Sequence, residues 1–183
     1  SKQIYERALD TISYNFPHYS LHESSHAQNI LRAIELVLGE DRICSLGPTD
    51  TWLILEAVYC HDFGMIISEK EAKELWQKPE FKAFIEKVST QNTDVGKAAC
   101  FLKNTENKDL MELALDIRYH VIILLADYVR SMHPERAERK ITNHEVGLDF
   151  SACGLVLPRF NKLLGKICKL HGSEFKEIEV LLP

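Results

Sequence analysis

Apolar residues recur along nearly the whole chain at the three- and four-residue spacing of amphipathic helices. Ile30, Ile34, Val37 and Leu38 form one such stripe, and Leu53, Ala57 and His61 form another. No segment shows the strict apolar-polar alternation of a half-buried strand. The pattern therefore predicts an all-α helical bundle of about eight or nine helices.

Most of the predicted helices have a glycine, a proline or a capping residue near one end, where such residues start or stop a helix. We expect helices at roughly 2–14, 23–39, 48–61, 68–79, 80–89, 94–103, 108–132, 134–141 and 158–172. No repeat, low-complexity tract or glycine-serine linker divides them. The prediction is a single helical domain over residues 1–183.

Composition narrows the class of protein. Hydrophobic residues make up 45% of the 183 residues, charged residues 27%, and the net charge is −5, so an extended nucleic-acid surface is not expected. The longest purely apolar run, VIILLA, is too short to cross a membrane. The five cysteines form no C-x-x-C pair, which favours a reduced, cytoplasmic protein over a disulfide framework.

The stretch EAVYCHDFGM places His61 and Asp62 side by side where an apolar helix is expected to stop. One interpretation is a core histidine whose ring nitrogens have ordinary hydrogen-bond partners. The other is that the pair binds a metal ion, because adjacent side chains can converge on one ion if the helix ends between them.

Two further histidines, His26 and His171, also lie on apolar helix faces near a predicted helix end. A buried imidazole without a partner costs free energy, so several of them in one core need either separate partners or a shared one. A metal ion is a shared partner that accepts imidazole and carboxylate ligands together, in a site between packed helices.

The other histidines carry weaker indications. His133, just before Pro134, is a candidate ligand or a capping residue. His22 lies one turn before His26, so it can reach the same site or a bound phosphate, or it is a solvated loop residue. We interpret the remaining three histidines as structural: His18, His120 and His144.

In this order the residues resemble the HD superfamily of metal-dependent phosphohydrolases. HAQNI resembles the family element that carries the first histidine, here His26, and CHDFGM resembles the name-giving pair, here His61 and Asp62. HPER resembles the element with the extra histidine of binuclear members, here His133. LLGKICKLHG resembles the helix that presents a later histidine, here His171. The resemblance covers about residues 16–172 and is closest to HD domains joined to GHKL-type ATPase domains. It implies an HD-like bundle and, in the full-length protein, an adjoining ATPase domain.

The resemblance implies a phosphohydrolase or phosphodiesterase that acts on a nucleotide or a related phosphate ester. One or two divalent ions would be held by His26, His61, Asp62, His133 and His171, with Asp62 bridging. Mixed nitrogen and oxygen ligands favour iron, manganese, cobalt or nickel, with zinc or magnesium as alternatives. A closed structural zinc site is less compatible, because no cysteine has the required spacing.

Arg136, one turn after His133, is a candidate for holding a substrate phosphate bidentately, and we group it with Asp62 as catalytic. The alternative for Arg136 is a surface ion pair with Glu135 or Glu138. The closing aspartate of the family, expected after the last histidine, has no counterpart after His171.

Asp127, in LLAD, has the sequence context of that closing aspartate but precedes His171. Either the chain is a fragment of a longer protein that lacks the closing helix, or Glu174, Glu177 or Glu179 substitutes, or the site is incomplete. The alternative function is therefore a catalytically silent regulatory or interaction domain of a larger signalling or defence protein.

Overall fold

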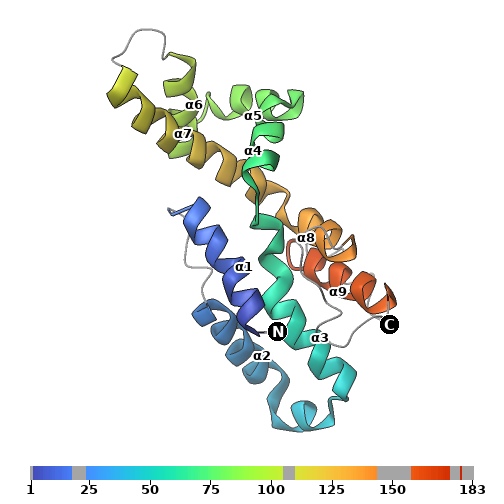
Figure 1. The fold of residues 1–183 in the computed structure, drawn as a ribbon. Helices are drawn as coiled ribbons and strands as arrows, with labels where there is room; N and C mark the ends of the chain where they lie inside the picture. The colour runs from blue at the N-terminus through green and yellow to red at the C-terminus, as the bar shows by residue number, and fades with distance from the viewer. Residues whose placement is uncertain (1, 18–23, 105–109, 144–157, 174–177, 179–183) are drawn as a thin grey trace.

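The computed structural model describes residues 2–17, 24–104, 110–143, 158–173 and 178 (Figure 1). These residues form helices and no strand, which confirms the all-α prediction. None of the helices in these ranges has the length and apolar character needed to cross a membrane. The elements are α1 (Lys2–Asn15), α2 (Ser24–Ser45), α3 (Pro48–Cys60), the 3-10 helix η1 (His61–Met65), α4 (Glu69–Gln77), α5 (Pro79–Val88), α6 (Asp94–Lys103), α7 (Leu110–Ser131), α8 (His133–Thr142) and α9 (Pro158–Leu170).

Figure 1 shows α4 to α7 at one end of the molecule and α1 to α3 with α8 and α9 at the other. The short helix η1 lies between these two groups and contacts α1, α3, α7, α8 and α9. Its most extensive packing is against α8, which in turn packs along α9. Segments from both ends of the chain therefore meet around the five residues His61–Met65.

The apolar core holds η1 in place. Phe63 and Met65, which follow the His-Asp pair, are 0% and 2% exposed. They belong to one apolar cluster that also contains Ile12 of α1, Ile141 of α8 and Leu164 of α9, all fully buried. Burying side chains of this size stabilises the fold by about 1.5–3 kcal/mol each, so the core fixes the backbone that carries His61 and Asp62.

Helix ends follow the predicted signals with one difference. Helix α3 begins at Pro48, after Gly47, whose N–H donates to Asp50 Oδ2 at 3.1 Å. The second predicted helix was expected to stop at Gly39, but α2 continues to Ser45. Gly39 interrupts it with φ 74° and ψ 164°, a conformation that glycine adopts without the steric cost other residues incur.

Candidate metal centre

The His-Asp pair lies where α3 gives way to η1. Helix α3 ends at Cys60, and the tighter 3-10 turn begins at His61. His61 Nε2 lies 3.0 Å from Asp62 Oδ2, so the two neighbouring side chains converge instead of pointing apart. Asp62 is 5% exposed, and a carboxylate buried to this degree requires positive or hydrogen-bonding partners.

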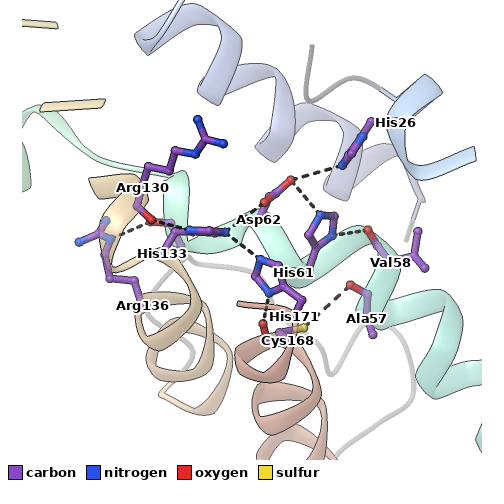
Figure 2. Close-up of polar contacts among 11 residues, drawn as sticks. His26, Ala57, Val58, His61, Asp62, Arg130, His133, Arg136, Cys168 and His171 are labelled. Atoms are coloured by element: carbon purple, nitrogen blue, oxygen red, sulfur yellow. Dashed lines mark hydrogen bonds and ion pairs between the residues drawn. The ribbon is translucent and has the colours of Figure 1, made fainter. Parts of the chain in front are cut away.

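Two further histidines approach Asp62 from other helices, and a third meets one of them, as Figure 2 shows. His26 Nε2, from the first turn of α2, lies 3.8 Å from Asp62 Oδ2. His133 Nε2, at the start of α8, lies 3.8 Å from Asp62 Oδ1. His171 follows α9, and its Nε2 lies 2.7 Å from His133 Nε2. The structure thus brings together the five residues predicted as ligands.

The five residues form two groups that share Asp62. His26 and His61 face Oδ2, and His133 faces Oδ1 with His171 beside it. Within each group the potential ligand atoms lie within 4.8 Å of one another. Each group can hold a metal ion, and the shared carboxylate has one oxygen directed to each group.

Backbone carbonyls fix the tautomers of three of these histidines. In each, Nδ1 faces the carbonyl oxygen of the residue three positions earlier: His61 with Val58, His133 with Arg130, and His171 with Cys168. A carbonyl oxygen only accepts, so Nδ1 carries the proton and donates. Nε2 of each neutral ring then keeps a free lone pair, the form that ligates metals.

The tautomers of His133 and His171 leave two nitrogen lone pairs that a metal ion could accept. His133 Nε2 and His171 Nε2 are 2.7 Å apart, so two lone pairs face each other next to a carboxylate oxygen. Two such acceptors repel unless a proton or a cation lies with them. A donor set of imidazole nitrogens and one carboxylate suits divalent transition metals, so these residues fit a metal ion of that kind.

Their surroundings shift the pKa values of His61 and His171 in opposite directions. Burial alone would lower the pKa of His61, but the hydrogen bond that the protonated ring donates to Asp62 and the negative charge of Asp62 outweigh it and raise the pKa. The pKa of His171 is lowered by burial and by the proximity of His61 and His133, against a raising hydrogen bond to the Cys168 carbonyl. His171 is therefore held in the neutral form that a metal ligand requires.

Glycines allow η1 and α8 to approach closely at the site. A Cβ at Gly64 would lie 1.8 Å from the His133 carbonyl oxygen. A Cβ at Gly172 would lie 2.3 Å from Cγ of Pro134, the residue after His133. Real Cβ atoms essentially never lie below 3.0 Å, so a side chain at Gly64 would displace the His133 backbone and one at Gly172 would displace the Pro134 ring. The glycine of CHDFGM thus has a packing role beside the metal-site residues.

We expect Gly64→Ala to displace the start of α8 and with it His133. Overpacking at this contact should lower the free energy of unfolding by about 3 kcal/mol. It should also weaken metal binding by roughly 10–100-fold, the usual cost of disturbing the support of a ligand. Urea unfolding and metal titration measure the two effects.

Gly96→Ala is the matched control. A Cβ there would lie 2.0 Å from the Gln91 carbonyl oxygen, a comparable clash, but α6 lies in the other half of the molecule (Figure 1). This variant should lose stability and keep its metal affinity. Equal loss of metal affinity in both variants would show that Gly64 has no specific role at the site.

Arg136 is buried and hydrogen-bonded on every side of its guanidinium group. It is 3% exposed. Nε donates to the Gly64 carbonyl at 2.7 Å, Nη2 to the Ile66 carbonyl at 3.0 Å, and Nη1 to Glu71 Oε1 at 2.7 Å. Its acidic partner is therefore Glu71 of α4, and neither Glu135 nor Glu138. The prediction that Arg136 binds a substrate phosphate finds no support in this arrangement.

Glu71, the acidic partner of Arg136, was not among the residues nominated from the sequence. Its carboxylate also accepts from Lys140 Nζ at 3.3 Å. Burial alone would raise the pKa of Glu71, but the hydrogen bond and charge of Arg136, and then of Lys140, outweigh it and lower the pKa. A Ser-x-x-Glu sequence such as Ser68 to Glu71 is typical of a helix start, and in the structure Ser68 Oγ accepts from the Glu71 N–H at 3.1 Å.

The remaining candidates lie elsewhere. Six of them lie outside the described residues: His18, His22, His144, Glu174, Glu177 and Glu179. Asp127 lines a separate pocket with Phe16 and Tyr119, away from the histidines. His120 stacks on Phe101 with ring centroids 4.0 Å apart, and its Nδ1 donates to the Asp116 carbonyl. Neither Asp127 nor His120 is part of the cluster.

An all-α bundle in which a His-Asp pair meets histidines from other helices is the arrangement of an HD-type domain. The chain belongs to the HD-CE family, an HD-type domain family whose model matches residues 16–183. Comparison with curated proteins and with solved structures found no match. The family match confirms the resemblance to the HD superfamily, and the adjoining ATPase domain stays a prediction.

Proposed function

We propose that this domain is a metal-dependent phosphohydrolase or phosphodiesterase. One observation carries the proposal: the two oxygens of buried Asp62 face two separate groups of imidazole nitrogens. Such a carboxylate can bridge two ions, and paired ions are a common device for displacement at phosphorus. The mixed donor set favours iron, manganese, cobalt or nickel over magnesium.

The five side chains would share the work of holding the ions. His26 and His61 would serve the Oδ2 side of Asp62, and His133 with His171 the Oδ1 side. Divalent ions would supply positive charge that polarises the phosphoryl group and activates water. Hydrolysis then adds water across a phosphorus–oxygen bond: phosphorus keeps the water oxygen, and the alcohol leaves with a proton.

The rest of the site would position these ligands. The Val58, Arg130 and Cys168 carbonyls hold Nδ1–H of three histidines, which directs Nε2 towards Asp62. Arg136 ties the Gly64 and Ile66 carbonyls to Glu71, so it would act on the turn that carries Asp62 instead of on the substrate. In this proposal Arg136 is a positioning residue.

The test is hydrolysis of p-nitrophenyl phosphate and bis-p-nitrophenyl phosphate by protein stripped with a chelator and reloaded with one metal at a time. We expect turnover that is lost on stripping and restored by manganese, iron, cobalt or nickel. Metal binding without turnover on these esters or on a nucleotide panel would contradict the proposal and support a catalytically silent domain.

A further inference from the structure

An apolar pocket of about 420 Å³ lies directly beside the histidine cluster. His26, His61 and His171 form part of its lining, so the pocket is continuous with the candidate metal centre. The remaining walls come from α2, α3 and α9. Its volume is within the range of about 300–1,000 Å³ typical of small-molecule sites.

The walls away from the histidines are hydrocarbon. They are formed mainly by Ile30 and Ile34 of α2, Ile54 and Val58 of α3, and Ile167 of α9. Among the described residues that line the pocket there is no lysine, arginine, aspartate or glutamate. A ligand group in this space is therefore selected by apolar contact and not by charge.

Two polar residues of the lining, Cys168 and His61, already have partners. Cys168 Sγ donates to the Ala57 carbonyl at 3.9 Å. His61 directs Nδ1 to the Val58 carbonyl at 2.9 Å and Nε2 to Asp62 at 3.0 Å. The aliphatic wall offers few donors or acceptors to a nucleobase, whereas a hydrocarbon group would gain from burial against it.

We infer that the substrate is a phosphate ester with a hydrocarbon group, which lies between α2, α3 and α9 while the phosphate faces Asp62. The inference rests on the proposed function and specifies its substrate class. It differs from the nucleotide expectation, because the pocket offers aliphatic contact where a base would need donors and acceptors.

Binding of non-hydrolysable n-alkyl phosphonates tests the inference without relying on turnover. Dissociation constants of ethyl, butyl and octyl phosphonate for the metal-loaded protein are measured by titration calorimetry. Each methylene that enters the pocket should tighten binding roughly fourfold, so butyl phosphonate should bind about fifteenfold tighter than ethyl phosphonate. Adenosine monophosphate should bind no more than about threefold tighter than ribose 5-phosphate.

Two variants of α2 localise the effect. Ile34→Asp puts a charge in the pocket wall and should remove the gain with chain length while ethyl phosphonate binding changes less than about twofold. Leu36→Asp is the matched control, because Leu36 is 85% exposed on the same helix, and it should keep the full gain. The wild-type series remains informative if Ile34→Asp fails to fold.

Equal dissociation constants for the three alkyl phosphonates would overturn the inference. A gain in affinity of tenfold or more from the adenine base would also overturn it. If the protein still hydrolyses p-nitrophenyl esters in a metal-dependent way, only the substrate class is wrong. If affinity rises with chain length but no ester is hydrolysed, the pocket is correctly assigned and the hydrolytic function is wrong.

Discussion

Asp62→Ala is expected to abolish metal binding and turnover together. Wild-type protein should carry about one or two equivalents of a divalent transition metal, as paired-ion sites do. The variant removes the only carboxylate in either group of potential ligands within the described residues. Loss of supporting contacts alone costs about 10–100-fold in activity, so loss of the shared ligand should cost at least about 100-fold.

Inductively coupled plasma mass spectrometry gives the metal content, and p-nitrophenyl ester hydrolysis gives the turnover. Asp62→Asn separates charge from shape, because the amide keeps the volume of the carboxylate and should also lose the metal. Asp127→Ala is the control for a half-buried aspartate outside the cluster, and it should keep both properties. An unchanged metal content in both Asp62 variants would contradict the assignment of Asp62 as a ligand.

Arg136→Met is expected to be the most destabilising change in the network behind the site. It leaves the Gly64 and Ile66 carbonyls without their donor and removes the closest cation from Glu71. Breaking one side of a buried ion pair costs about 3–5 kcal/mol. Since Lys140 remains beside Glu71, we expect a loss of about 2–4 kcal/mol in the free energy of unfolding.

Arg139→Met is the matched control for this loss. Arg139 belongs to the same helix and approaches the same Glu71 oxygen at 3.7 Å, but its side chain is 51% exposed. Exposed ion pairs contribute little, so this variant should lose less than about 1 kcal/mol. Urea unfolding compares the two. Similar losses would show that burial of Arg136 does not decide its contribution.

Metal affinity shows whether Arg136 positions the metal ligands or only stabilises the fold. If Arg136 holds the η1 turn, Arg136→Met should weaken metal binding by roughly 10–100-fold in protein that is still folded, and Arg136→Lys should restore part of it. A variant that is less stable but binds metal with wild-type affinity would limit Arg136 to a structural role.

Much of the fold could be predicted from local sequence patterns. Helical periodicity indicated the all-α class, and Pro48 and Pro134 marked helix starts that the structure has. The same patterns placed His26, His61 and His171 on apolar faces near helix ends. The histidines were nominated because a polar side chain near a helix end stands out against an apolar stripe. In the structure the side chain of His26 is 42% exposed and His171 is exposed, so only His61 matches the expected burial closely.

Long-range partners could not be predicted in this way. Glu71 and Arg136 are 65 residues apart, and Glu71 lies in the first turn of α4, where a glutamate indicates only a local helix start. The contact depends on the packing of α8 against η1, which Gly64 permits by leaving room for the His133 carbonyl. The close approach of two backbones leaves no periodic signal in either segment.

The sequence by itself therefore determined the helices and the residue types available to a metal ion, since these depend on contacts within a few residues. It did not determine every buried face, because Val37, predicted on the buried stripe of α2, is 81% exposed. Only the tertiary structure decided that the histidines form two groups around Asp62, that Arg136 binds Glu71 and that an aliphatic pocket adjoins the site. The reason is physical: a helical pattern specifies that a face is buried, whereas the geometry of packing between distant helices specifies what that face meets.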